Sequence, residues 1–363
     1  MQSHIFINGR FAAQALTGVQ RTAWAQVRAL DELLDASDAP NWTLLCPRGV
    51  ELPVLRTIQV RHVGIAGLPL HAWEQLTLPW AARGGLLLNL AGGAPWLARR
   101  QACLLHDAAV FDVPEAYSRS FRVWYRALFR HLAKRARPLF TVSRFSQDRL
   151  AQVLRVPPSR LQVLSNAGEH ITRTPADTGL LARHGLQRGR FLLTVASESP
   201  AKNTALLVRA LASVPTQPAP RLVWVGRRNR RVFATTAHAA DGDQVLRLTD
   251  VDDAGLRALY ESALLLAVPS RYEGFGLPAL EAMACGCPVL AARAGALPEV
   301  CGAAAAYFDA EQPDELAALL EAALADPGWL DRLRQAGPVR ARQFSWSASA
   351  GQLRAALLAG ATS

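Results

Sequence analysis

Short apolar runs alternate with longer helix-like segments along the chain, and this alternation restricts the possible fold more than any other feature. Several runs are apolar throughout, as expected for strands that are covered on both faces. Strands that alternate with helices predict an α/β protein with doubly wound parallel sheets. The runs predicted as strands are residues 4–9, 42–47, 57–64, 85–92, 102–107, 139–143 and 162–167, followed by 190–197, 221–226, 244–250, 263–270, 287–293 and 304–309.

A polar, broken stretch at 166–189 interrupts the alternation. A chain of 363 residues is too long for one ordinary domain and suits two. We therefore predict an N-terminal Rossmann-like domain over 1–168, a C-terminal one over 169–344, and a last helix over 345–363 that crosses back to the first domain. We expect the two domains to face each other across a cleft, with ligands beyond the carboxyl ends of the strands.

Composition favours a globular protein of a reducing compartment. Half of the residues are hydrophobic and 19% are charged, and no apolar run reaches the roughly 18 residues of a membrane span. The amino terminus lacks the pattern of a signal peptide, so we expect a cytoplasmic location. The five cysteines suit buried free thiols. Cys285 and Cys287 lack further nearby ligands, so we expect no metal.

The net charge of +11 concerns partners more than fold. It is compatible with nucleic acid, an anionic membrane surface or phosphorylated substrates. The sequence has no zinc-finger spacing, no RNP aromatic pattern and no basic region joined to heptads, so we expect no nucleic-acid partner.

The stretch "SRYEGFGLPALEAMACGCP" at 270–288 carries two glutamates after a predicted strand. Glu273 lies in the loop, and Glu281 is expected in the first turn of the next helix, close to the same edge of the sheet. Gly274 and Gly276 allow the backbone to approach a ligand, and N–H groups at a helix start favour phosphate. Alternatively, Glu281 only opposes the helix dipole and Glu273 is a solvated loop residue. The spacing alone leaves both interpretations open.

Motifs along most of the chain resemble the retaining glycosyltransferases of family 4, which have the GT-B fold. The most specific is "EGFGLPALEAMACGCPVLAARAGALPEV", which is similar to the donor-site signature of that family. Weaker motifs support it: "INGRF" with "LTGVQR", "LLHD", "FTVSRFSQDRL", "VPPSRLQVLSNAGEH", "SESPAKN" and "FSW".

The resemblance implies a role for each donor-site residue. Glu281 matches the glutamate that holds the ribose hydroxyls, and Glu273 matches the one that contacts the transferred sugar. The backbone amides of the segment after Glu273 would line the sugar and the diphosphate, and Lys202 would neutralise phosphate charge. The residues of that segment are Gly274, Phe275, Gly276 and Leu277.

Two residues of the first domain complete the implied site. His106 follows a predicted buried strand and precedes Asp107, and would lie near the donor sugar. A lone histidine is more often structural, but this position favours a functional one. Gly18, in the loop after the first strand, would give the diphosphate or acceptor access to backbone. A plain helix-start glycine is an equal alternative.

The chain departs from the family pattern at two places. Ala201 in "SPAKN" stands where members commonly carry an arginine, so one phosphate-neutralising cation is missing. We predict Arg227, directly after a strand, as its replacement. The "PNG" turn of the family occurs here as "SNAG", which leaves a contact by Asn166 open.

The resemblance implies transfer of a hexose or deoxyhexose, of mannose, rhamnose or glucose type, from a nucleoside-diphosphate sugar bound by the domain 169–344 to an acceptor on the side of the domain 1–168. The acceptor would be a glycan or a polyprenyl-diphosphate-linked oligosaccharide of bacterial surface polysaccharide synthesis. The anomeric configuration would be retained, without a metal or cofactor. Alternatives are a sugar-nucleotide epimerase of the same architecture and a non-enzymatic polyanion-binding protein. A dinucleotide dehydrogenase is disfavoured because G-x-G-x-x-G is missing after the first strand of either domain.

Residues 117–138 form a predicted amphipathic helix with an aromatic face and a cationic face. A helix packed on the sheet with a solvated outer face would explain the pattern. The alternative that we favour is docking to the anionic inner-membrane surface, which would bring a lipid-linked acceptor to the site.

Overall fold

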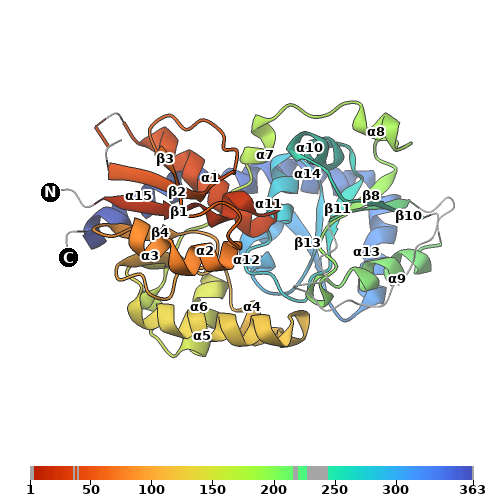
Figure 1. Cartoon of the computed structure of the whole chain (residues 1–363). Helices are drawn as coiled ribbons and strands as arrows, with labels where there is room; N and C mark the ends of the chain where they lie inside the picture. The colour runs from red at the N-terminus through yellow and green to blue at the C-terminus, as the bar shows by residue number, and fades with distance from the viewer. Residues whose placement is uncertain (1–3, 36, 39–40, 216–219, 227–243, 362–363) are drawn as a thin grey trace. The chain divides into compact units, whose positions relative to one another are not determined.

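The computed structural model describes the chain except for residues 1–3, 36, 39–40, 216–219, 227–243 and 362–363. It contains two compact units, each built around its own parallel sheet (Figure 1). The first unit comprises Met1–Ala108, Val123–Asn166 and Trp346–Ser363, and the second comprises Ala109–Arg122 and Ala167–Ser345. The prediction of two α/β, doubly wound domains is confirmed.

The first unit holds a seven-stranded sheet with the order β3-β2-β1-β4-β5-β6-β7, and all its strand pairs are parallel. The chain therefore winds outward from β1 to one edge and from β4 to the other. Every predicted strand of this half forms. The strands are β1 (Ile5–Asn8), β2 (Trp42–Pro47), β3 (Gln59–Val63), β4 (Leu86–Asn89), β5 (Gln101–Leu104), β6 (Leu139–Thr141) and β7 (Gln162–Val163).

Helices from both ends of the chain pack in the first unit. Phe6, Leu45 and Leu87, from three neighbouring strands, form one core cluster with Trp73 of α2 and Leu78 of α3. The helices that lie wholly in this unit are α1 (Gly18–Leu33), α2 (Leu70–Leu76), α3 (Leu78–Ala81), α6 (Arg144–Leu154) and α15 (Trp346–Ala361), with 3₁₀ turns η1 (Gly9–Ala13) and η4 (Pro158–Arg160).

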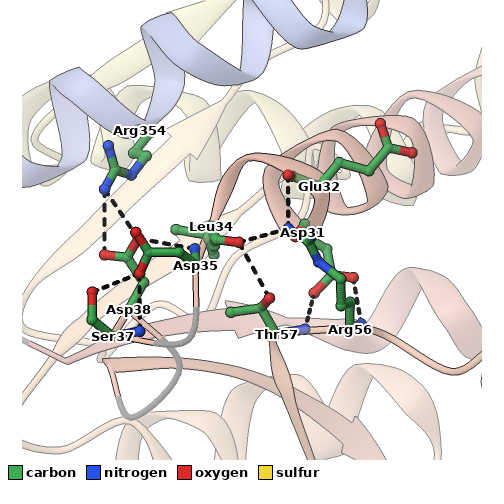
Figure 2. Close-up of polar contacts among 9 residues, drawn as sticks. All are labelled: Asp31, Glu32, Leu34, Asp35, Ser37, Asp38, Arg56, Thr57 and Arg354. Carbon is green, nitrogen blue, oxygen red and sulfur yellow. Dashed lines mark hydrogen bonds and ion pairs between the residues drawn. The ribbon is translucent and has the colours of Figure 1, made fainter.

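The carboxyl end of the chain is attached to the first unit by polar contacts as well as by apolar packing. Gln26 of α1 donates to the Ser349 hydroxyl of α15 at 2.7 Å, and both side chains are buried. Arg354 donates to Asp38 at 3.1 Å (Figure 2). Leu353 and Leu357 are fully buried. The last helix is therefore part of this core.

The carboxyl end of α1 is bound by the segment that precedes β3 (Figure 2). The Asp31 carboxylate accepts the backbone N–H groups of Arg56, Thr57 and Ile58 at 2.6, 2.8 and 2.7 Å. The Arg56 guanidinium in turn donates to backbone carbonyls of the last turn, at 2.8 Å for Leu34. Helix carbonyls without an intrahelical partner need such donors. The two residues thereby hold α1 and the β3 segment together.

The second unit holds a six-stranded parallel sheet with the order β10-β9-β8-β11-β12-β13. Here too every predicted strand forms, and β8 and β11 are neighbours at the point where the winding reverses. The strands are β8 (Phe191–Val195), β9 (Arg221–Val225), β10 (Val245–Leu248), β11 (Leu265–Val268), β12 (Val289–Ala292) and β13 (Ala305–Phe308).

Helices of the second unit include α11, which follows β11 and approaches α14 closely. A Cβ atom on Gly337 of α14 would lie 3.2 Å from the Met283 backbone of α11. The helical elements are α4 (Ala109–Asp112), α7 (His170–Arg173), α8 (Leu180–Arg183), α9 (Thr204–Ser213), α10 (Asp253–Ser262), α11 (Leu277–Ala284), α12 (Leu297–Cys301), α13 (Pro313–Ala325) and α14 (Pro327–Ala341), with 3₁₀ turns η3 (Pro114–Ala116), η5 (Pro200–Lys202) and η6 (Gly302–Ala304).

The division differs from the predicted boundaries in one segment. We assigned all of 1–168 to the first domain, whereas Ala109–Arg122 belongs to the second unit. The physical reason is that η3 packs against η5, which follows β8 of the second sheet. The long helix α5 (Arg119–Arg135) consequently begins in one unit and continues in the other.

The aromatic side chains of α5 contact α2 and the segment after β4. Trp124 lies 4.7 Å from His71 and 6.0 Å from Trp96, between ring centroids. His131 stacks on Trp96 at 4.4 Å. Part of the predicted aromatic face is therefore used for packing within the first unit. Among the helices of the described residues, none has the length and apolar character needed to cross a membrane.

Candidate active site

The loop after β11 and the start of α11 are shaped by Gly276. This residue is the N-cap of α11 and has a φ of +93°, in the left-handed region that favours glycine. Pro278 lies in the first turn, where a missing N–H costs nothing. We predicted Glu281 in the first turn of this helix. Because the helix begins at Leu277, Glu281 lies in the second turn instead. The interpretation that Glu281 serves the helix dipole loses its geometric basis.

The Glu281 carboxylate is held by two residues from other elements. It is only 2% exposed. One oxygen lies 2.9 Å from His170 Nε2 of α7, and the other accepts the Tyr260 hydroxyl of α10 at 3.0 Å. Each carboxylate oxygen has the capacity for about two hydrogen bonds. These contacts from two other elements fix the carboxylate in orientation.

Glu273 is also buried, at 9% exposure, so the alternative that it is a solvated loop residue is wrong. Its Oε1 accepts Lys202 Nζ and Ser270 Oγ, both at 2.7 Å. Lys202 lies in η5, after β8, and Ser270 directly follows β11. Because β8 and β11 are neighbours in the sheet, their carboxyl ends bring the cation and the carboxylate together at the switch point, where doubly wound sheets bind ligands.

The four residues after Glu273 are all buried. They are Gly274, Phe275, Gly276 and Leu277. The Phe275 ring meets Phe344 edge to face, with ring centroids 5.8 Å apart. A Cβ on Gly276 would lie 2.6 Å from Leu297 Cδ2. The backbone of this segment is therefore held rigidly beside the ion pair of Lys202 and Glu273.

Arginines near the predicted phosphate loop are paired with carboxylates. Arg247 of β10 donates to Glu198 at 2.6 Å and its guanidinium lies 4.1 Å from the centre of the Trp224 ring. The backbone N–H of Arg271 donates to the Ala201 carbonyl at 2.8 Å. Arg227, our predicted replacement for the missing cation, lies outside the described residues. Arg247 is a cation of this loop region that the sequence did not reveal.

His106 lies in the first unit, after β5, and is half-buried. Its Nε2 lies 2.8 Å from the Leu90 carbonyl, so Nε2 carries the proton and Nδ1 has the lone pair. Burial lowers the pKa of His106 to about 4, although the hydrogen bond to Leu90 opposes this. The imidazole is consequently neutral at pH 7.

Gly18 also lies in the first unit, as the first residue of α1. It is exposed, and a Cβ atom there would have no described atom within 4 Å. Neither packing nor a positive φ requires glycine at this position.

Metal ligands do not gather in the part of the chain that is described. No group of three or more histidine, cysteine, aspartate or glutamate side chains there could hold an ion. Cys285 and Cys287 are free thiols, and burial raises the pKa of Cys285 to about 12.

The residues that sequence reasoning missed are the partners of the two glutamates. His170 lies in the polar, broken stretch at 166–189, and Tyr260 lies in a helix-like segment between two predicted strands. Ser270 was part of the quoted motif but had no assigned role. None carries a local signal, because each acquires its role through a contact between distant elements.

Solved structures share the whole architecture. Sucrose-phosphate synthase from Thermosynechococcus elongatus superposes with a TM-score of 0.73 at 19% identity, over 99% of this chain and 100% of that one. HepE of Anabaena, in complex with UDP and glucose, gives 0.71 at 18% identity, over 98% and 99%. WaaG, a glycosyltransferase involved in lipopolysaccharide biosynthesis, gives 0.71 at 15% identity, over 96% and 98%. The fold is that of the GT-B glycosyltransferases.

Sequence relatives identify the family. The model of the family described as "Glycosyl transferases group 1" matches residues 182–340. O-antigen chain mannosyltransferase B of Escherichia coli is 30% identical over 261 residues, 69% of this chain and 68% of that protein. MMP alpha-(1->4)-mannosyltransferase of Mycolicibacterium hassiacum is 34% identical over 279 residues, 74% of this chain and 66% of that protein. The chain belongs to the group 1 glycosyltransferases and is a glycosyltransferase.

Proposed function

We propose that this glycosyltransferase moves a hexose of the mannose type from a nucleoside-diphosphate sugar to a glycan acceptor. The names of the relatives support the sugar, since two of them are mannosyltransferases and one of these acts on O-antigen chains. The complex of HepE with UDP and glucose supports a nucleotide-sugar donor. Rhamnose- and glucose-type sugars belong to the same proposal as the alternatives to be screened.

The observation that carries the proposal is the pair of buried glutamates around one strand-loop-helix unit. In the proposed complex, Glu281 accepts the vicinal hydroxyls of the ribose, and Glu273 accepts a hydroxyl of the transferred sugar. The backbone between Glu273 and α11 faces the sugar and the diphosphate. Lys202, 2.7 Å from Glu273, binds both the sugar-facing carboxylate and a phosphate oxygen. Arg227 stays our candidate for the second phosphate cation.

The proposed chemistry is electrostatic. Negative charge develops on the diphosphate as the glycosidic bond breaks, and a preorganised lysine with helix-start amides stabilises it. The acceptor oxygen then bonds to the anomeric carbon on the face that the diphosphate leaves, and the diphosphate takes the proton of that hydroxyl, so the anomeric configuration is retained. We propose that Lys202 fills the place a metal ion takes elsewhere and that no cofactor takes part. The two glutamates do not act as a glycosidase pair, because Glu281 belongs to the ribose.

His106 is proposed to act as a neutral hydrogen-bonding group near the transferred sugar. With Nε2–H committed to Leu90, Nδ1 can accept a sugar hydroxyl. A neutral ring does not repel positive charge that develops at the anomeric carbon. Gly18 is proposed to let the diphosphate or acceptor approach the start of α1.

The acceptor is proposed to be lipid-linked, at the cytoplasmic face of a membrane. The outward side of α5 carries exposed Arg130, Lys134 and Arg135, and Val123 is 63% exposed. Each basic group near an anionic bilayer is worth about 1 kcal/mol. Co-sedimentation with vesicles containing phosphatidylglycerol at low salt should detect binding, and an Arg130→Glu, Lys134→Glu double variant should weaken it. Equal recovery with neutral vesicles would contradict membrane docking.

A panel of nucleotide sugars tests the donor and the reaction. We expect one mannose-type donor to raise the melting temperature and to release its nucleoside diphosphate when a mannoside acceptor is added, with and without EDTA. NMR of the product should show the anomeric configuration of the donor. If no nucleotide sugar binds or reacts, the proposal fails. Isomerisation of the donor without an acceptor would identify an epimerase instead.

A further inference from the structure

The first unit has a second switch point, between β1 and β4, whose buried polar side chains have no role in the proposed donor contacts. The chain winds away from these two neighbouring strands in opposite directions, which is where doubly wound sheets bind ligands. Asn8 is the last residue of β1 and Asn89 is the last of β4. Both side chains are buried, at 4% and 1% exposure. The edge formed by the carboxyl ends of β1 and β4 therefore carries buried polar side chains, whereas the buried part of a sheet is normally apolar.

A buried carboxylate connects the two asparagines to an arginine. Asn8 Nδ2 donates to Asn89 Oδ1 at 2.9 Å and to Glu74 Oε1 at 3.0 Å. Arg10 Nη1 donates to Glu74 Oε2 at 2.6 Å, and Glu74 of α2 is 1% exposed. Burying an ion pair in this way is seldom favourable for stability in itself. The network therefore suggests a task for Arg10.

Arg10 is only partly satisfied by the protein. Its Nε is buried and has no hydrogen-bond partner among the described residues. Buried donors are normally paired, so an orphan atom suggests a ligand or water. Tyr125 of α5 lies against the same guanidinium: burial raises the pKa of Tyr125, and the charge and hydrogen bond of Arg10 oppose that rise. A guanidinium donor and a phenol thus lie next to each other at this edge.

The backbone of the loop after β4 passes close to Arg10 and Glu74, and also to His106. A Cβ atom on Gly93 would lie 3.0 Å from both Arg10 Nη1 and Glu74 Oε1. One on Gly92 would lie 3.8 Å from His106 Cδ2. Because neither position carries a Cβ atom, the backbone of this loop lies close to Arg10 and to the neutral imidazole.

The charge of this edge is balanced. Glu74 holds Arg10 at ion-pair distance, so an anionic group would gain attraction from the guanidinium and suffer repulsion from the carboxylate. A neutral polyol can instead accept from Arg10 and exchange hydrogen bonds with Tyr125, without a net charge to desolvate.

We propose that Arg10 and Tyr125 form the subsite for the terminal sugar of the acceptor, that this sugar is uncharged, and that Glu74 is the positioning residue that balances Arg10. The proposal rests on the proposed function, because it assigns the second substrate of the same transfer. It keeps the acceptor on the side of the first unit, as the family resemblance implies, and names the residues that hold its terminal sugar.

The test compares transfer to methyl α-D-mannopyranoside with donor binding and with slow donor hydrolysis in the absence of an acceptor. We expect Arg10→Met to raise the acceptor KM at least ~10-fold, from the loss of charged hydrogen bonds, while donor affinity and hydrolysis stay within ~2-fold of wild type. Tyr125→Phe, which keeps the ring contact with Phe129, should raise the acceptor KM by ~3- to 10-fold. Arg28→Met, an exposed arginine of α1, is the matched control.

Glu74→Gln separates a positioning role from a merely structural one. The amide has the same shape, but it leaves the Arg10 charge unbalanced. We expect the ratio of inhibition constants for mannose 6-phosphate and methyl α-D-mannopyranoside to shift ~10-fold toward the phosphate. If Glu74→Gln only destabilised the protein and left the site unchanged, the ratio of the two inhibition constants would stay the same. An unchanged acceptor KM in both Arg10→Met and Tyr125→Phe overturns the subsite, and an unchanged ratio in Glu74→Gln overturns charge balance. If wild type binds no nucleotide-sugar donor, the proposed function is refuted instead.

Discussion

The Glu281 carboxylate should bind the ribose of the donor, and its surroundings allow the binding energy to be separated from stability. Glu281→Gln keeps the shape and one carbonyl acceptor, whereas Glu281→Ala removes both oxygens. A hydrogen bond to a charged group contributes about 1.5–3 kcal/mol. We therefore expect the dissociation constant of the nucleoside diphosphate to rise ~10-fold for Gln and ~100-fold or more for Ala.

The same substitutions should affect stability to different extents. Tyr260 is fully buried, so Glu281→Ala leaves its hydroxyl without the acceptor at 3.0 Å and should lower the free energy of unfolding by about 1–3 kcal/mol. The control is Tyr260→Phe, which removes that hydroxyl and leaves the carboxylate. It should lower stability by about 1 kcal/mol and leave nucleotide affinity within ~3-fold.

Isothermal titration with UDP or GDP and its 2′-deoxy analogue provides the decisive comparison. Wild type and Tyr260→Phe should bind the ribonucleotide ~10-fold more tightly, because only it offers both hydroxyls to the carboxylate. Glu281→Ala should bind the two ligands alike. If Glu281→Ala still discriminates between them as wild type does, the assignment of Glu281 to the ribose is refuted.

Three further predictions concern other parts of the molecule. Lys202→Met should lower kcat/KM for transfer by ~10²–10³, as expected when one preorganised charge is removed. Ser270→Ala, which removes an uncharged partner of the same carboxylate, should lower kcat/KM less than ~10-fold. Similar losses for both variants in steady-state assays would contradict the phosphate role of Lys202. Burial lowers the pKa of His106 from 6.5 to about 4, so between these pH values the unfolded chain binds a proton there that the folded protein does not. The free energy of unfolding should therefore fall by up to about 3 kcal/mol as the pH drops from 7 to 4. Urea titrations should show this loss in wild type and not in His106→Asn, and parallel pH profiles of the two proteins would refute it. Asp31→Ala should lower the free energy of unfolding by about 2–4 kcal/mol, since three backbone N–H groups, that of buried Ile58 among them, lose their acceptor. Nucleotide affinity should stay unchanged. A loss of less than about 0.5 kcal/mol by urea titration would argue against this role of Asp31.

The donor region contains both correct and incorrect sequence inferences. Pro278 and Gly286 mark the start and the end of α11 as predicted, because helix ends are encoded by local backbone preferences. Glu281 was predicted in the first turn, but it is the fifth residue of α11, which begins at Leu277, and so lies in the second turn. The burial of Glu273 could not be foreseen, because Lys202, its ionic partner, is 71 residues away.

The sequence by itself determined the two parallel sheets, every strand within them and the class of enzyme. These properties follow from local periodicity, from turn chemistry and from one specific motif around Glu273, all of which are written in consecutive residues. The tertiary structure alone decided that His170 and Tyr260 hold Glu281, that Ala109–Arg122 joins the second unit, and that Arg10 meets Glu74. These contacts join elements that are far apart in the chain, and such pairings are fixed only when the sheets have formed and their strand ends lie side by side.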